Sequence, residues 1–249
     1  MCKNNPCFNS VTVFVLASNE VVSLRETVNK IKENCDDEDL EKIVIVLKSE
    51  NCPSFAEAEK LSAENSKMEL YIQKAPTAAL CLAELPALAE SSHFIIMASD
   101  LEMDPDSIKD FISLAKKHPA SIICAAKWLK GSTVEGYGLL HEICSRTMNL
   151  FISFLFAKNI KDPFSVFQIY PVSVYRKMKF SNPSAFLYEY TLKPLHLGVE
   201  YIEIPTVYKK RREEKSNFNI ATLVDVAVRF CLTALKIRFT PKRYPDEDK

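Results

Sequence analysis

Three carboxylates stand at alternating positions directly after an apolar run. The run covers residues 94–98, and Asp100, Glu102 and Asp104 follow it. Such a run predicts a buried strand, and in an open α/β sheet ligands bind at the carboxyl ends of strands. In extended geometry alternate residues project to one side, so two of these carboxylates would offer hard oxygen ligands to one divalent cation.

A second interpretation concerns Asp104 alone. The pair Asp104-Pro105 is typical of a helix start, with the aspartate as N-cap and the proline in the first turn. Capping accounts for Asp104 but leaves Asp100 and Glu102 unexplained. We therefore expect a metal and phosphate site at the first two and a helix start at the third.

Composition limits the class of protein. The 249 residues carry 32 Lys plus Arg and 32 Asp plus Glu, so net charge does not indicate a nucleic-acid partner. The charge is uneven, however: residues 33–41 are acidic and residues 209–243 are strongly basic. We expect any anionic partner to meet the C-terminal third of the chain.

Several common phosphate-binding and catalytic motifs are missing from the sequence. It has only four glycines and contains no G-x-G-x-x-G, P-loop or G-x-S-x-G motif, so phosphate must be held by metal, Arg and Lys. The four histidines are scattered without metal-ligand spacing. Eight cysteines without a C-x-x-C pair, and no signal-peptide pattern, predict reduced thiols in a cytoplasmic protein.

Strand and helix patterns alternate along the chain, which predicts an α/β fold with a mainly parallel central sheet flanked by helices. The predicted strands cover residues 11–16, 42–47, 68–72, 93–98 and 121–126, with strand-like stretches at 165–170 and 200–207. The predicted helices cover residues 21–33, 54–65, 77–90, 105–117, 139–157 and 186–197.

The apolar stretch at residues 220–239 predicts a C-terminal amphipathic helix. Polar residues recur in it every three or four positions and form a narrow stripe. Such a helix either packs on the domain or lies in a membrane interface, and the nearby Arg238, Lys242 and Arg243 favour membrane contact. The stretch at residues 148–157 is too short to cross a bilayer.

Further motifs follow one another along the chain. They are Ser18-Asn19-Glu20, Ser99-Asp100-Leu101-Glu102, Ser145-Arg146, Asp162-Pro163-Phe164-Ser165, Glu189 and the basic segment from Arg211 to Asn217. Their order resembles the family 2 glycosyltransferases with a glycosyltransferase-A (Rossmann-like) fold, and within that family it is most similar to the dolichyl- or polyprenyl-phosphate sugar synthases. The resemblance covers residues 11–238 and implies one catalytic domain at residues 9–217, followed by the C-terminal helix and basic tail at 218–249.

The resemblance implies roles for individual residues. Asn19, Glu20 and Ser49 would lie on the nucleotide side. Asp100 and Glu102 match the family's D-x-D pair, which binds Mg²⁺ or Mn²⁺ on the diphosphate of a nucleotide-sugar donor. Glu20 could instead be a carboxylate favoured at a helix start.

The resemblance also implies basic groups for phosphate, because guanidinium donates in a planar, bidentate manner. Arg146 matches the family's Ser-Arg arginine, and Arg211, Arg212 and Lys215 its basic loop. Alternatively, Arg146 pairs with a carboxylate on its own helix and the basic segment is a solvated charge run. Glu189 is a candidate general base for an acceptor hydroxyl, or else a structural residue, since a phosphate acceptor needs no strong base.

The sequence departs from the family pattern at the nucleotide side. Leu16 and Ser18 stand where Pro and Tyr are usual, and Leu47-Lys48-Ser49-Glu50 replaces the usual Asp-Asp-Gly-Ser. Asn217 and Gln168 stand where basic residues are common. The identity of the nucleotide therefore cannot be carried over from the family.

Together these observations predict a metal-dependent glycosyltransferase that moves a sugar to a polyprenyl-phosphate or other lipid-linked acceptor at the cytoplasmic membrane face. A membrane surface, and a membrane-embedded partner protein, are the expected contacts. One alternative is transfer to a sugar hydroxyl of a glycan acceptor, with Glu189 as base. Another is a non-catalytic nucleotide-binding or scaffold protein descended from such enzymes.

Overall fold

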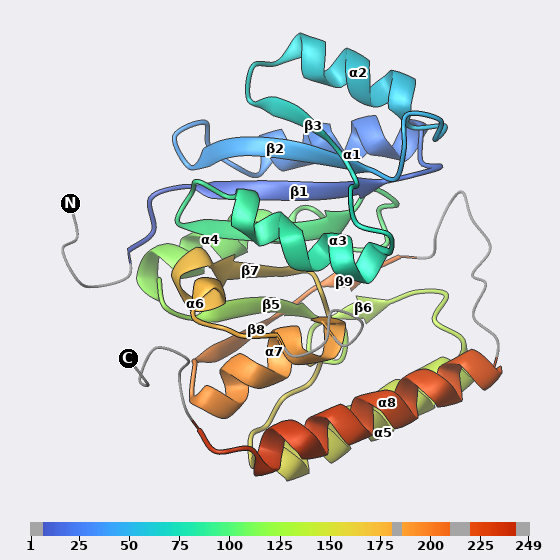
Figure 1. Cartoon of the computed structure of the whole chain (residues 1–249), viewed down its shortest axis with the longest axis vertical. Coiled ribbons are helices and arrows are strands. Elements are labelled where there is room, and N and C mark those ends of the chain that lie inside the picture. The colour runs from blue at the N-terminus through green and yellow to red at the C-terminus, as the bar shows by residue number, and fades with distance from the viewer. Residues whose placement is uncertain (1–6, 181–185, 210–219, 243–249) are drawn as a thin grey trace.

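A seven-stranded sheet forms the centre of the protein. The computed structural model describes residues 7–180, 186–209 and 220–242 (Figure 1). The strand order is β3-β2-β1-β4-β7-β5-β8, and all neighbours are parallel except at β7, which runs antiparallel to β4 and β5. The predicted α/β class with a mainly parallel sheet is thus confirmed. The strands are β1 (Val11–Ala17), β2 (Leu40–Leu47), β3 (Met68–Ile72), β4 (His93–Ala98), β5 (Ile122–Ala126), β7 (Gln168–Pro171) and β8 (Tyr201–Pro205).

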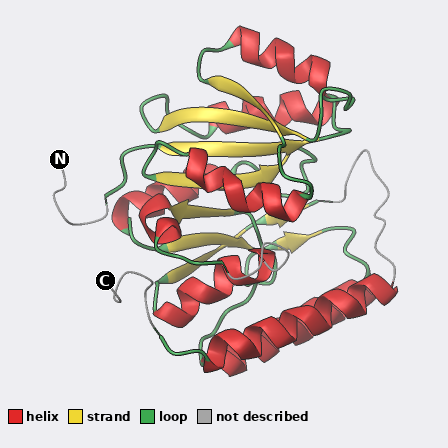
Figure 2. Cartoon of the chain, in the orientation of Figure 1, coloured by secondary structure: helices red, strands yellow, loops and turns green. Residues whose placement is uncertain are grey.

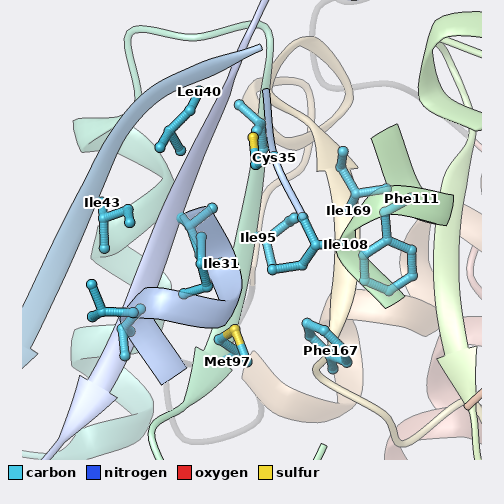
Figure 3. Packing of buried hydrophobic residues seen from close by; sticks show 14 of the residues in the cluster. Ile31, Cys35, Leu40, Ile43, Ile95, Met97, Ile108, Phe111, Phe167 and Ile169 are labelled. Carbon is cyan, nitrogen blue, oxygen red and sulfur yellow. The ribbon is translucent and has the colours of Figure 1, made fainter. Parts of the chain in front are cut away.

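Helices cover both faces of the sheet, which explains why its central strands are mainly apolar (Figure 2). On one face lie α1 (Val22–Glu33), α2 (Phe55–Glu64) and α4 (Ser107–Lys117). Their apolar residues meet alternate strand residues in the core that Figure 3 shows, where Ile31 and Phe111 pack against Ile95 and Ile169.

The opposite face is covered by α3 (Ala78–Glu84), α6 (Val172–Arg176) and α7 (Phe186–Leu197). Aromatic rings fill this side of the core: Phe94 stacks on Tyr170 with ring centroids 5.3 Å apart, and Tyr170 stacks on Tyr190 at 4.8 Å. The helix predicted over residues 77–90 is interrupted, because Pro86 lies in a short 3₁₀ turn, Leu85–Leu88, that follows α3.

Two long helices, α5 (Leu139–Phe156) and α8 (Ile220–Phe239), lie side by side along one end of the molecule (Figure 1). They run parallel, since Cys231 Sγ meets Met148 Sδ at 3.7 Å and Arg238 Nε donates to the Leu155 carbonyl at 2.8 Å. Both pack with α7 in a third apolar cluster. The predicted C-terminal helix therefore exists with the predicted bounds and packs on the domain.

A second, two-stranded sheet was not predicted. It pairs β6 (Thr133–Val134) with β9 (Val207–Tyr208), near the carboxyl ends of the parallel strands. None of the helices in the described ranges is both long and apolar enough to span a membrane. The division at residues 217 and 218 stays a prediction.

Candidate active site

The carboxyl ends of the central strands bring the predicted nucleotide and metal residues to one edge of the sheet. In the parallel register Leu16 pairs with Ala98, and Ala17 pairs with Leu47. Asn19, Ser49 and Asp100 follow these strand ends by two residues each. Register alone thus places the three residues at the same edge, as ligand sites in open α/β sheets require.

The segment after β4 turns sharply, so the expectation of an extended chain at the carboxylates is wrong. Leu101 has a φ of 59°, a left-handed conformation that a branched side chain rarely adopts. The turn allows the Glu102 N–H to donate to Asp100 Oδ1 at 3.0 Å. A strained residue between two candidate ligands is a feature typical of functional sites.

Asp104 has a different role from the other two carboxylates. Its Oδ1 accepts from the Asp106 N–H at 3.3 Å, just before α4, and its oxygens form ion pairs with Lys209 at 3.1 Å and Lys30 at 3.7 Å. Burial alone would raise the pKa of Asp104, but the Asp106 N–H and the Lys209 ammonium hold it below its ordinary value. Asp104 therefore organises the turn that precedes α4. The predicted cap is wrong in detail, because α4 begins at Ser107 with Asp106 at its N-cap position, and Pro105 lies before the helix.

Residues of β9, and Lys209 directly after it, contact the segment that follows β4. The backbone N–H of Lys209 donates to the Glu102 carbonyl at 2.8 Å, and Met103 forms a bridge with Tyr208. Burial raises the pKa of Tyr208 above its ordinary value, and the adjacent Glu102 carboxylate, to which the phenol is hydrogen-bonded, raises it further. Tyr208 therefore stays a neutral donor that orients Glu102.

A buried ion pair lies behind this layer. Lys127, directly after β5, places its ammonium 2.9 Å from Asp162 Oδ2, which also accepts from the Lys127 backbone N–H at 3.0 Å. Burial would lower the pKa of Lys127, but the Asp162 charge more than offsets this and raises it. The Lys127 ammonium also lies 5.7 Å from the centre of the Tyr208 ring, which links the pair to the strand end.

A series of aromatic contacts connects Arg146 with Tyr208. Its guanidinium lies 4.5 Å from the centre of the Trp128 ring, and Trp128 contacts Tyr137, which contacts Tyr208 in turn, with ring centroids 5.3 and 5.4 Å apart. Arg146 Nε also donates to Glu142 on its own helix at 2.8 Å, the pairing foreseen as an alternative. The Arg146 side chain is nevertheless 56% exposed, so its remaining donors can meet a phosphate.

The structure gives Glu20 a local role. Its carboxylate accepts from the backbone N–H groups of Ser18 and Asn19 at 2.8 and 3.0 Å, which closes the loop between β1 and α1. Asn19 is exposed at this loop, and Ser49 is half-buried after β2. Their predicted contacts with a nucleotide stay predictions.

The structure does not bring Glu189 together with the strand-end carboxylates in any contact that it records. Glu189 lies on α7, is almost fully buried, and pairs with Lys193 at 3.0 Å. Its role as a base stays a prediction. The predicted basic-loop residues Arg211, Arg212 and Lys215 lie outside the described residues.

The carboxylates of Asp100 and Glu102 are the candidate ligands for a divalent cation. Within residues 7–180, 186–209 and 220–242 no group of three His, Cys, Asp or Glu side chains is arranged to hold a metal. Mg²⁺ in nucleotide enzymes needs only one or two protein carboxylates, with water and substrate phosphates completing the shell. Asp100 and Glu102, joined by the turn at Leu101, fit that limited requirement.

The model of glycosyl transferase family 2 matches residues 12–182, about two thirds of the chain. The chain belongs to this family. The predicted family and the predicted enzyme class, a glycosyltransferase, are therefore confirmed.

Solved structures of a glucosyl-3-phosphoglycerate synthase from Mycobacterium tuberculosis share the fold. One, in complex with Mn²⁺, UDP and phosphoglyceric acid, has a TM-score of 0.68 at 12% identity, over 94% of this chain and 80% of that one. Another, with Mg²⁺ and UDP, has a TM-score of 0.67 at 11% identity over the same shares. A third, with Mn²⁺, UDP-glucose and phosphoglyceric acid, has a TM-score of 0.65 at 13% identity, over 94% and 81%. The glycosyltransferase-A type of fold is thus confirmed.

Sequence reasoning missed part of the site. Trp128, Tyr137 and Tyr208 carry no motif, and their convergence depends on the small β6–β9 sheet. Lys127 is also unmarked, although its partner Asp162 stands in a quoted motif. A lysine at the end of an apolar strand was the one available signal, because a charge so placed usually needs a buried partner.

Proposed function

We propose that this family 2 glycosyltransferase uses Mg²⁺ or Mn²⁺ to transfer a sugar from a nucleotide-sugar donor to a lipid-linked phosphate at a membrane surface. The observation that carries the donor half is the turn at Leu101, which holds Asp100 and Glu102 together at the carboxyl edge of the sheet. The similar solved structures support it, because they contain UDP or UDP-glucose with Mn²⁺ or Mg²⁺.

The site residues have separable tasks in this proposal. Asp100 and Glu102 would hold the cation, which would neutralise charge developing on the leaving nucleoside diphosphate. Tyr208 orients Glu102, and Lys209 fixes the backbone of the same turn. Arg146 would donate to a phosphate of the donor or the acceptor, and its contact with the Trp128 ring would hold the guanidinium in place.

The acceptor half of the proposal rests on the surface of α5 and α8. Leu139, Ile143, Leu150 and Phe154 are exposed along one face of α5, with Leu150 72% and Phe154 84% exposed. On α8 the exposed apolar residues are Val228, Leu232, Leu235 and Phe239. We call these eight residues the apolar stripes. Each stripe lies opposite the face that its helix buries in the third cluster.

Large apolar side chains exposed in a row favour an apolar partner. Lys236, Arg238 and Lys242 are exposed near the end of α8, and this combination of apolar and basic groups suits an anionic membrane surface. Arg146 lies on the same face of α5, four residues before Leu150, so a lipid-borne phosphate at Arg146 would leave its chain beside the stripe. A cytoplasmic location and a membrane-embedded partner protein remain part of the proposal.

Transfer assays test the two halves separately. Purified protein is first screened by thermal shift against nucleoside diphosphates with and without Mn²⁺, because a ligand that binds the native state raises Tm. The nucleotide that binds is then supplied as its sugar conjugates with a polyprenyl phosphate in vesicles, or with soluble hydroxyl acceptors. We expect Mn²⁺-dependent binding and transfer to the lipid phosphate.

The results of these assays distinguish a lipid-phosphate acceptor from a hydroxyl acceptor and from a non-catalytic protein. Transfer only to a hydroxyl acceptor, abolished by Glu189→Gln, would favour the glycan or small-molecule acceptor; the phosphoglyceric acid in the similar solved structures is the observation that keeps this candidate. Nucleotide binding without any transfer would favour a non-catalytic protein. Absence of binding for every nucleotide would overturn the proposal.

A further inference from the structure

A pocket with a mainly apolar lining and several charged residues lies between α7 and the end of α8. Its volume is about 270 Å³, and the residues that matter in its lining are Lys177, Lys179, Glu189, Lys193, His196 and Lys236. None of the strand-end residues lines it. Figure 1 shows the C-terminal end of α8 to the lower left of β6 and β9, and Glu189, the candidate base for a hydroxyl acceptor, is the only predicted site residue in the described lining of the pocket.

Positive charge is in excess around the pocket. Lys193 pairs with Glu189 at 3.0 Å and also donates to the Lys179 carbonyl, so it fixes one wall. Lys177, Lys179 and Lys236 are exposed at the rim, and none of these three makes an ion pair with a carboxylate in the described part of the chain. Among the described residues that line the pocket, four carry an ammonium group and one, Glu189, carries a carboxylate, so a bound anion would reduce the repulsion between the lysines.

His196 contributes a buried imidazole to the wall of the pocket. It is only 6% exposed, and its Nε2 lies 2.8 Å from the Thr240 carbonyl oxygen. Because a carbonyl oxygen only accepts, Nε2 carries the hydrogen of that bond. The other nitrogen, Nδ1, is buried without a hydrogen-bond partner, and such a group is usually satisfied by a bound molecule or water.

We propose that this pocket binds a phosphate monoester. Ammonium groups on flexible stems suit phosphate oxygens, since each supplies up to three donors as a compact charge. His196 lines the same pocket, so its imidazole would report the binding of such a ligand. The pocket lies just below the volume range of sites for drug-sized ligands, which limits the ligand to a small headgroup.

Two sources supply this chemistry: a free phosphorylated metabolite, or the headgroup of an anionic lipid. The neighbouring Phe239, which is 77% exposed at the end of α8, brings the apolar stripe to the rim and makes the lipid source testable alongside the free one. Apart from Glu189, the residues of the site are distinct from the proposed catalytic, metal and nucleotide residues, so binding there can be tested without sugar transfer.

Histidine-selective NMR provides the test. The chain has four histidines, so the imidazole signals of the full-length protein are few, and His196→Gln assigns the signal from the pocket. Glycerol 1-phosphate is titrated in the presence of a chelator and without nucleotide, which keeps the metal site out of the experiment. We expect a saturable shift of the His196 signal, with smaller or no shifts for His93, His118 and His141.

Variants locate the binding. Lys179→Ala with Lys236→Ala should weaken the apparent affinity about tenfold or more, because two charged donors are lost. Lys60→Ala with Lys109→Ala removes the same charge from exposed positions on α2 and α4 and should leave the affinity unchanged. No saturable His196 shift, or equal weakening by both pairs of substitutions, would overturn the proposal.

Vesicle sedimentation separates the sources. Phosphatidylcholine vesicles with phosphatidic acid are compared for the wild type and both double variants. A tenfold loss of binding confined to Lys179→Ala with Lys236→Ala identifies the lipid headgroup. A His196 shift with free glycerol 1-phosphate, combined with unchanged vesicle binding in the same variant, identifies a free metabolite.

Discussion

The carboxyl edge of the sheet and the paired helices α5 and α8 differ in which side chains they bury and which they expose. At the sheet edge, buried charged groups are paired: Lys127 with Asp162, and Asp104 with the partly exposed Lys209 and Lys30. On α5 and α8, apolar side chains such as Leu150 and Phe154 are exposed to solvent. Charge inside and apolar surface outside both raise the free energy of an isolated soluble domain.

The comparison shows how function is separated from stability in this molecule. The buried groups at the sheet edge cannot be removed without disturbing their partners, so substitutions there should cost stability, activity or both. The exposed stripes make few contacts within the chain, so substitutions there should cost only the binding of an outside partner. The following predictions test this difference, from the largest expected effect to the smallest.

Removing the charge of Lys127 should have the largest effect on stability. In Lys127→Met the Asp162 carboxylate, which is fully buried and has one oxygen without a hydrogen-bond partner, loses its counter-charge. We expect the free energy of unfolding to fall by about 3–5 kcal/mol in urea denaturation. Asp162→Asn in the same background should recover part of the loss.

The matched control is Lys42→Met, which breaks the Lys42–Glu69 pair at a surface strand. Glu69 is 54% exposed, so this loss should stay below about 1 kcal/mol. Equal losses for the two lysines would contradict the importance of burial at the sheet edge.

Asp100→Ala should abolish catalysis rather than folding. We expect turnover to fall by about 10²–10³-fold, the cost of removing one group that stabilises developing charge, and the Mn²⁺-dependent rise in Tm with nucleotide to disappear. Asp110→Ala, at an exposed position on α4, should change neither quantity. Retained Mn²⁺-dependent binding in Asp100→Ala would place the metal elsewhere.

His93, at the amino end of β4, should make the free energy of unfolding decrease at acid pH. Burial lowers the pKa of His93, the first residue of β4, to about 4, below the ordinary histidine value of about 6.5. The folded state therefore favours the neutral ring, and its contribution is fully present above pH about 6.5 and is lost as the pH falls toward 4. Between pH 6.5 and 5 we expect a loss of about 1–2 kcal/mol.

Urea denaturation at both pH values checks this effect. His93→Gln removes the titrating ring, so its free energy of unfolding should depend less on pH over that interval, whatever its value at pH 7. His141→Gln, on α5, should keep the pH dependence of the wild type. An unchanged slope in His93→Gln would show that other groups cause the acid destabilisation.

The smallest effect on folding is expected in the apolar stripes. Leu150→Glu should change the free energy of unfolding by no more than about 0.5 kcal/mol, because the side chain is 72% exposed. Binding to anionic vesicles should nevertheless fall about tenfold through loss of one inserted leucine. Ala63→Glu adds the same charge at an exposed position on α2 and should leave vesicle binding nearly unchanged.

Local sequence patterns determined the framework of this protein. Apolar runs and helix periodicity identified the strands and helices of the sheet, and the end of one run identified Asp100 and Glu102. The Asp104-Pro105 pair predicted the start of α4 to within two residues, although Asp106 and not Asp104 occupies the N-cap position. These features depend on neighbours within a few residues, so the chain specifies them without reference to its fold.

Tertiary structure alone decided the environment of the site. Asp104 and Lys209 are 105 residues apart, and the link from Tyr208 to Glu102 needs the small sheet that no local pattern predicted. The left-handed turn at Leu101 replaced an expected extended chain. The sequence also left open whether residues 220–239 pack on the domain or meet a membrane. In the fold one face of this helix packs against α5 and α7, and the other face exposes an apolar stripe. Only the tertiary structure decides this, because burial of a helix face depends on contacts with helices that are distant in sequence.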